Sequence, residues 1–411
     1  MSFLVVQFIC VIVAIGFAST YVTRTSFVFE ERIVFGVFLG TVQVSLLGFF
    51  IAWLTTVNWQ MILITEVVLI VAYFPLLIRR GSVLKADLEN FFIRIRARWK
   101  DPSSPRITLF LLLASSIVSA RILQISFGKS SSGGGTVSHL SVFGDWSAHL
   151  AYASSFAYGD NFPPELPTAA GESFSYHFGV DWFAAMFVPL GADVFAAMQI
   201  STFFLAAFFP PMLYLGCRRF TSNTRAALIA VAAFLLSGGT GALYRFLFVD
   251  LPAEGLGVLG NLPRSYAFDG FNRNWVDNAV TGFLYPQRPT LIGFSAVILV
   301  IVFLWENRSV KNSGTYIFAG VFTGLLPFFH VFAFGTILLL SFTWAAMSRR
   351  QYWIRFLCPA LVIGIPIIIW QWPDRDGRSW HFLWMLGKSS WENNPWDFAW
   401  FWFLNTGLFI P

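Results

Sequence analysis

The chain has 411 residues, of which 56% are hydrophobic, 18% are aromatic and only 12% are charged. Soluble globular domains carry about 25% charged residues, so this composition excludes an ordinary soluble protein and indicates a polytopic helical membrane protein. The formal net charge of +6 is attributed to basic loops that orient the chain in the bilayer, and not to nucleic-acid binding. The three cysteines have no paired spacing, so neither a disulfide framework nor a zinc cluster is indicated.

Apolar blocks near the length needed to cross a bilayer recur from end to end, and they predict an all-α transmembrane bundle of about 10–11 spans. The predicted spans are 3–21, 33–54, 60–78, 107–124, 190–216, 225–237, 290–305, 314–330, 331–347, 353–371 and a final stretch at 396–411. Because the last stretch stops at the end of the sequence, we expect the chain to continue in a longer protein. The predicted domains are an N-terminal three-span unit at 1–81, a basic linker at 82–106 and a core at 107–411.

Basic residues gather in four of the links, near positions 79–106, 218–225, 308–311 and 349–355. Counting crossings puts all four links on one face, which the positive-inside rule identifies as cytoplasmic. Within the first link, segment 82–100 alternates apolar and basic residues at helical spacing, which predicts an amphipathic helix on the inner leaflet.

The two long loops, 125–189 and 237–289, then lie on the extracytoplasmic face, where short interfacial helices are expected. All five histidines fall on or beside that face: His139, His149, His177, His330 and His381.

The loop between residues 144 and 181 carries ionisable groups beside membrane-length segments, where they are costly to desolvate and are therefore functional candidates. Asp145 and His149 are four residues apart, and His177 and Asp181 repeat this spacing in reverse order. Residues four apart share one face of a helix. We predict one short helix at 146–158 and a second that begins near Tyr176, with both His/Asp pairs facing a common cleft.

Asp145 is the predicted general base, because a carboxylate at the membrane boundary can accept a proton from an incoming hydroxyl. Two alternatives stay open at this point. Asp145 could instead N-cap the helix, with the histidines bonded to backbone carbonyls. Asp145, His149, His177 and Asp181 could also hold one divalent metal ion together.

The second loop supplies arginines that could bind an anion. Arg288 is held between prolines at the start of a span, and Arg264 precedes it. Arginine binds phosphate through two parallel hydrogen bonds, although a snorkelling interfacial arginine is an equal alternative for Arg288. His330 ends a helix on the same face and could cap the helix or contact a ligand. Glu66 lies inside the third span, where it needs a partner or a proton.

These motifs, taken together over about residues 107–411, resemble the GT-C glycosyltransferases. Members of that superfamily transfer a sugar from a polyprenyl-phosphate carrier on the outer face and place an essential Asp in the first large external loop. The residues that carry the resemblance are Gly144-Asp145-Trp146, the run at 159–167, Tyr176 to Asp181, and Pro286-Gln287-Arg288. They are also similar to uncharacterised bacterial multi-span membrane proteins. Two departures are that the Asp follows the fourth predicted span and that the family's acidic pair is reduced to one residue.

The resemblance implies a bacterial cell-envelope enzyme of the plasma membrane with an extracytoplasmic active site. Its partners would be a polyprenyl-phosphate sugar donor, a glycan, lipid or protein acceptor and the lipid bilayer. Asp145 would be catalytic, a divalent metal could be a cofactor, and the candidate substrate-binding residues are His149, Glu165, Tyr176, His177, Asp181, Arg264, Gln287, Arg288 and His330. A transporter or lipid flippase, and a non-catalytic subunit of an envelope polysaccharide assembly, are the alternative functions.

Overall fold

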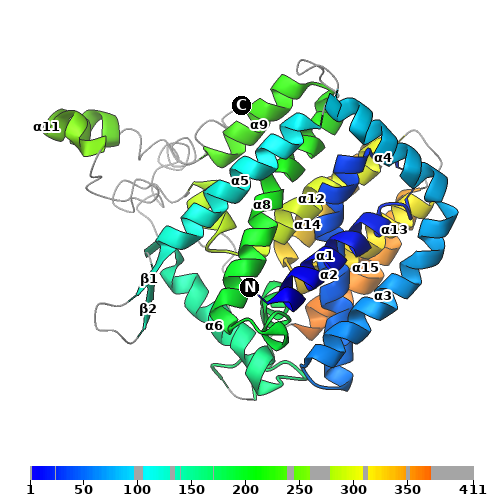
Figure 1. Ribbon diagram of the computed structural model, residues 1–411, viewed down its shortest axis with the longest axis horizontal. Helices are drawn as coiled ribbons and strands as arrows, with labels where there is room; N and C mark the ends of the chain where they lie inside the picture. The colour runs from blue at the N-terminus through cyan, green and yellow to red at the C-terminus, as the bar shows by residue number, and fades with distance from the viewer. Residues whose placement is uncertain are drawn as a thin grey trace. The chain divides into compact units, whose positions relative to one another are not determined.

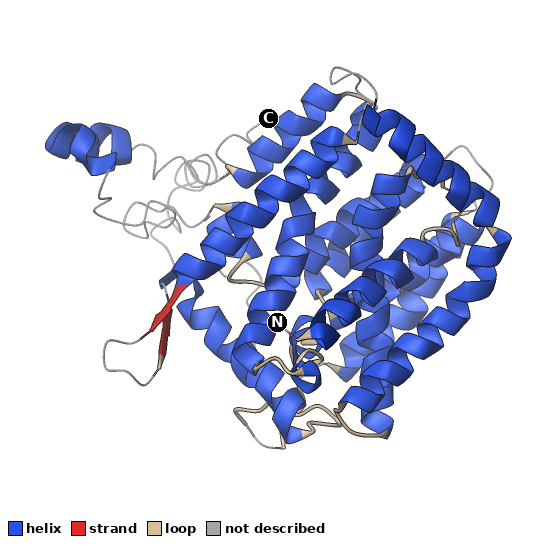
Figure 2. Ribbon diagram, in the orientation of Figure 1, coloured by secondary structure: helices blue, strands red, loops and turns tan. Residues whose placement is uncertain are grey.

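The computed structural model describes residues 2–23, 25–96, 105–129, 135–138, 140–169, 171–237, 245–259, 278–308, 313–348 and 352–371. This part of the chain is helical apart from loops and two short strands (Figure 2), which confirms the predicted all-α class. The predicted stretch at 396–411 lies outside the described residues.

Ten helices in the described part of the chain correspond to the predicted spans, and Figure 1 shows their arrangement. They are α1 (Phe3–Ser19), α2 (Phe29–Leu54), α3 (Trp59–Arg79), α5 (Arg106–Ser126), α8 (Val194–Thr221), α9 (Thr224–Leu235), α12 (Pro289–Glu306), α13 (Ser313–Gly324), α14 (Val331–Ser348) and α15 (Trp353–Trp370). Seven of the described helices, α2, α3, α5, α8, α12, α14 and α15, are long and apolar enough to cross a membrane. The spans predicted at α1, α9 and α13 correspond to shorter apolar helices.

The residues group by their contacts into two compact units, 1–228 with 288–373 and 229–287 with 374–411. The three helices of the predicted N-terminal unit belong to the first of these units, because α2 packs against α7 (Gly179–Ala185), α8 and α12. The second unit contains the short helical segments Phe246–Asp250, α11 (Leu251–Glu254), Gly255–Leu259 and Ala279–Leu284.

Glycines allow α1 and α2 to pack with their backbones in contact (Figure 1). A Cβ atom at Gly16 would lie 1.7 Å from the carbonyl oxygen of Gly36, and one at Gly40 would lie 2.1 Å from that of Ile12. Gly36 and Gly40 form a GxxxG spacing, in which small residues permit the close approach of two membrane helices. This packing explains why α2 is among the most buried helices of the first unit.

Ion pairs attach the amphipathic helix α4 (Gly81–Arg96) to the bundle. Asp87 accepts hydrogen bonds at 2.9 Å from both Arg32 Nε and the hydroxyl of Tyr21. The guanidinium of Arg94 binds both carboxylate oxygens of Glu30, at 2.6 and 2.7 Å. The predicted helix at 82–100 is therefore present over 81–96, and its acidic and basic side chains pair with the first turn of α2 and the end of α1.

The segment between α5 and α8 holds two helices and a hairpin. Strand β1 (Phe127–Lys129) pairs antiparallel with β2 (Thr136–Ser138), and the sequence did not predict this pair. Helix α6 (Leu140–Gly159) begins six residues before the predicted start at 146, and α7 begins at Gly179, three residues after the predicted start near Tyr176. The span predicted from residue 190 begins at Val194, because Asp193 caps α8 by accepting the N–H of Ala196 at 2.9 Å.

Candidate functional site

Asp181 is the centre of a buried polar network at one end of the first unit. The residue lies in the first turn of α7 and its side chain is fully buried. One carboxylate oxygen accepts a hydrogen bond from Arg288 Nη1 at 2.8 Å, and the other lies 2.9 Å from Nδ1 of His149. The sequence predicted that His149 and Asp181 would face one cleft; the structure brings them into direct contact, so that Asp181 fixes the orientation of the His149 ring.

Arg288, just before α12, is also fully buried. Its Nε donates to the hydroxyl of Thr202 at 2.8 Å, and its Nη2 donates to that of Ser201 at 2.7 Å. The guanidinium carbon lies 5.7 Å from the ring centroid of Trp146 on α6. The snorkelling alternative for Arg288 is therefore wrong, because snorkelling requires the charged head to reach water.

Local sequence explains why an arginine can occupy this position. Pro289 is the first residue of α12, where its missing N–H removes no hydrogen bond. A cation beside a helix N-terminus is unfavourable, because that end of the helix carries partial positive charge. The carboxylate of Asp181 offsets this repulsion. Desolvating two charges is costly, and a buried pair is tolerated when its remaining polar atoms are also bonded. Here Ser201, Thr202 and His149 provide those bonds.

Asp145 lies beside this network but takes no part in its hydrogen bonds. It is one helical turn before His149 on α6, about 6 Å along the axis, and its side chain is half-buried. Because α6 begins at Leu140, the N-cap alternative for Asp145 is wrong. Among the described residues its carboxylate has no hydrogen-bond or ion-pair partner, while its charge contributes to raising the pKa of Tyr176.

His177 and His330 form a second cluster with Tyr176, and this cluster adjoins the network because the ring centroids of Tyr176 and His149 lie 5.9 Å apart. The Tyr176 and His177 rings stack with centroids 4.0 Å apart, and the ring centroids of His177 and His330 are 5.4 Å apart. Nδ1 of His330 accepts the N–H of Ala333 at 3.0 Å, so His330 caps the start of α14 and not the end of the helix before it. Burial lowers the pKa of His177 to about 3, with smaller contributions from His330 and His149, and lowers that of His330 to about 4. Both imidazoles are therefore neutral at pH 7.

No group of three or more His, Cys, Asp or Glu side chains within the described ranges lies close enough to hold a metal ion. The predicted metal ligands Asp145, His149, His177 and Asp181 thus do not form such a group. The network also disfavours a metal ion at Asp181 and His149. The carboxylate of Asp181 already neutralises the guanidinium of Arg288, and Nδ1 of His149 is hydrogen-bonded to Asp181.

Glu165 and Glu66 have their partners outside this network. Glu165 is exposed and accepts the N–H of Gly171 at 3.1 Å within its own loop. Gln287 belongs to the second compact unit. Glu66 is buried and has the partner that its position demanded, because Gln7 of α1 donates to it at 2.8 Å. Arg264, His139 and His381 lie outside the described residues, so their assignments stay predictions.

Sequence reasoning missed Ser201 and Thr202. Hydroxyl side chains within apolar helices usually bond to the carbonyl one turn earlier, as Ser201 also does here to Met198 at 3.1 Å. Two adjacent hydroxyls in the N-terminal half of a predicted span were the available signal, but no feature of the sequence connected them to an arginine 86 or 87 residues away.

Comparisons of the chain with protein-family models, with curated proteins and with solved structures find no match. The resemblance to the GT-C superfamily therefore depends on the motifs of the chain itself.

Proposed function

We propose that the protein is a membrane glycosyltransferase of GT-C type, which moves a sugar from a polyprenyl-phosphate carrier to an acceptor hydroxyl on the extracytoplasmic face. The observation that carries the proposal is the half-buried, unpartnered carboxylate of Asp145 beside the fully bonded His149–Asp181–Arg288 network. Asp181 is occupied by two partners, whereas Asp145 is free to accept a proton. Functional groups held beside a rigid, fully bonded polar network are typical of catalytic sites.

In the proposed reaction, Asp145 removes the proton of the acceptor hydroxyl as its oxygen attacks the anomeric carbon of the donor sugar. A new glycosidic C–O bond forms, and the bond between the anomeric carbon and the phosphate oxygen breaks. The bonding electrons leave with the polyprenyl phosphate, and Asp145 passes its proton to solvent afterwards. No nucleotide is required, because the carrier lipid supplies the leaving group.

We assign Arg288 a positioning role in this reaction. Its guanidinium is fully buried and bound to Asp181, Ser201 and Thr202, so direct contact with a phosphate would require these bonds to open. Through them it joins the start of α12 to α7 and α8, and through Asp181 it holds His149 one turn from Asp145. Arg264 remains the predicted phosphate ligand of the second loop.

The distribution of buried charge favours an enzyme over a transporter. Among the described residues of the first unit, buried ionisable side chains gather in two groups, His149, His177, Asp181, Arg288 and His330 at the site and Glu30, Glu31 and Arg32 at the start of α2. Apart from tyrosines, Glu66 is the one buried ionisable side chain among the described residues of that unit outside these groups, and it is paired with Gln7. A transport path requires polar groups at mid-depth on several spans.

The proximity of Asp145 to the network argues against a purely structural subunit. Its neighbour in the chain, Trp146, contacts the Arg288 guanidinium, and His149 follows one turn later. A scaffold would not require these groups to share one end of α6.

The proposal is tested with purified protein reconstituted in vesicles and supplied with polyprenyl-phosphate sugars that carry a radiolabelled sugar. We expect label to pass to an acceptor when the donor is on the face that exposes Asp145. Translocation of intact donor across the bilayer, without loss of its sugar, would instead identify a flippase.

A further inference from the structure

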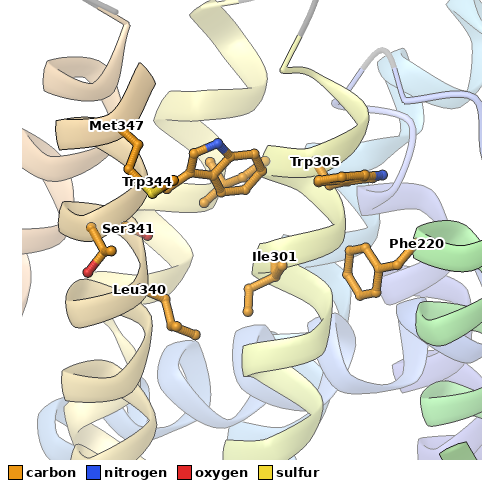
Figure 3. A pocket seen from close by; sticks show the side chains of 9 residues that line it. Phe220, Ile301, Trp305, Leu340, Ser341, Trp344 and Met347 are labelled. Atoms are coloured by element: carbon orange, nitrogen blue, oxygen red, sulfur yellow. The ribbon is translucent and has the colours of Figure 1, made fainter. Parts of the chain in front are cut away.

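A cavity lies at the far end of the first unit from the candidate site. It has a volume of about 440 Å³ and is bounded by the ends of α8, α12 and α14, with Phe220, Ile301, Trp305, Leu340, Trp344 and Met347 among its lining side chains (Figure 3). Arg288 precedes α12 and Trp305 lies near its other end, so the two sites are separated by about 26 Å along the helix. Binding sites for small ligands have volumes of about 300–1,000 Å³.

The cavity opens sideways between membrane-length helices. Of its lining side chains, Leu340 is 45% exposed and Met347 is 81% exposed. Their neighbours Leu339 and Phe342 on α14 are also exposed, at 68% and 47%, and α14 is apolar enough to span a bilayer. An exposed apolar surface on such a helix faces lipid. The cavity therefore opens to the hydrocarbon region of the bilayer. The apolar groups that can enter it there are the acyl chains of lipids.

A cation lies next to Trp305, one of the residues that line this cavity. Arg308 follows α12, and its guanidinium carbon stands 3.9 Å from the ring centroid of Trp305. Its Nη1 donates to the carbonyl oxygen of the same residue at 2.6 Å, and the side chain is exposed. Tryptophan is enriched at the level of lipid headgroups, and guanidinium groups bind phosphate oxygens with charge-assisted hydrogen bonds. The guanidinium of Arg308 and the apolar cavity are thus adjacent, as the phosphate and the acyl chain of a phospholipid are.

We infer that this cavity is a binding site for one acyl chain of an anionic phospholipid, whose phosphate is bound by Arg308. The site is separate from the proposed sugar-transfer site and does not depend on that function. An anionic lipid is preferred because a zwitterionic headgroup brings its own cation, which competes with Arg308 for the phosphate.

The experiment uses the full chain in nanodiscs that contain an anionic phospholipid with a photoactivatable group in its acyl chain. After illumination, digestion and mass spectrometry, we expect the label in the peptides that contain Ile301, Trp305 and residues 340–347. Ser341 is buried and lines the cavity, so Ser341→Phe fills the cavity and this labelling is lost. Leu339→Phe on the exposed side of α14 is the matched control and retains it.

Competition between anionic and zwitterionic lipids tests the role of Arg308. Arg308→Gln should reduce the preference for the anionic lipid about two- to fivefold, the size of an exposed charged contact. Arg355→Gln, which removes an exposed arginine from α15, should leave the preference unchanged. Unfolding curves and elution volumes establish that each variant is folded.

Labelling spread evenly over exposed α14 and insensitive to Ser341→Phe would overturn the inference. Absence of label from these peptides would also overturn the inference, because it would mean that the lipid does not enter the cavity, for example when another segment of the chain occupies it. If Arg308→Gln and Arg355→Gln lose the preference for anionic lipid equally, the preference comes from general surface charge and Arg308 does not bind the phosphate specifically.

Discussion

Asp181 and Arg288 lie 107 residues apart in the sequence, and their side chains form an ion pair of 2.8 Å from which solvent is excluded. Such a pair gains stability only when the rest of its polar atoms are bonded, because the desolvation of both charges opposes it. The hydrogen bonds from His149 and to Ser201 and Thr202 meet this requirement. The pair therefore makes three helices and the start of α12 depend on each other.

Arg288→Ala should destabilise the fold by about 3–5 kcal/mol, because it leaves the Asp181 carboxylate buried without its countercharge. Thermal unfolding in detergent measures the effect. Arg288→Lys should rescue little of the loss, since one ammonium cannot reproduce contacts made by three different guanidinium nitrogens. The double variant Asp181→Asn with Arg288→Met should be more stable than Arg288→Ala, and equal destabilisation of the two would contradict an electrostatic origin.

The backbone contact between α1 and α2 predicts a strong position dependence for glycine substitutions. Gly16→Ala places a methyl group 1.7 Å from a backbone oxygen of the facing helix, so the helices must separate. We expect a cost of at least about 1–3 kcal/mol. Gly335→Ala on α14 is the matched control, because nothing lies within 4 Å of the added methyl group. Similar unfolding temperatures for the two variants would show that α1 and α2 do not pack in this way.

Stability should fall as pH is lowered from neutrality toward 5. Burial lowers the pKa of His177 to about 3 and that of His330 to about 4, from 6.5 in the unfolded chain. Below pH 6.5 the unfolded state therefore binds protons that the folded state does not, and each histidine costs about 2 kcal/mol of stability by pH 5. Well above pH 6.5 neither state binds these protons, and the cost disappears.

Unfolding temperatures at pH 5 and 7.5 measure this dependence. His177→Phe should reduce the difference between the two pH values, because it removes one of the two titrations. An unchanged difference would mean that the pKa of His177 is the same in the folded and unfolded protein, as for an exposed imidazole.

The ion pairs of α4 predict that this helix loosens when Arg94 is changed. Arg94→Gln removes a bidentate contact to the buried Glu30, so hydrogen exchange in 81–96 should become faster. Lys85→Gln breaks an exposed pair of 3.9 Å with Glu89, and such pairs contribute little. Equal exchange rates in both variants would show that lipid alone holds α4 in place.

Helix positions were the part of this fold that the sequence predicted best, because long apolar runs have few alternative structures in a membrane. The predicted helix ends were less accurate where a side chain caps the helix and so determines its first residue. The span predicted from residue 190, for example, begins at Val194, because Asp193 caps α8. The GxxxG spacing at Gly36 and Gly40 was a readable signal for the α1–α2 contact that the sequence analysis did not use.

The site could be predicted only in part. His149 and Asp181 were expected to lie near each other, since helical spacing relates each to a neighbour on the same loop. Their contact with Arg288 depends on how α6, α7, α8 and α12 pack, and local spacing carries no information on a pair separated by 107 residues. For the same reason Arg288 was predicted as a phosphate ligand, although its guanidinium is buried against Asp181.

The central claim is that Asp145 accepts the proton of the acceptor during sugar transfer. Its most direct test is the initial rate of transfer from a labelled polyprenyl-phosphate sugar by Asp145→Asn, with Asp160→Asn as the control. Asp160 is exposed and has a positive φ of 48°, which asparagine also adopts readily. We predict that Asp145→Asn lowers the rate by about 10²–10⁴-fold with the unfolding temperature unchanged, and that Asp160→Asn transfers sugar normally. Wild-type transfer by Asp145→Asn would contradict the account.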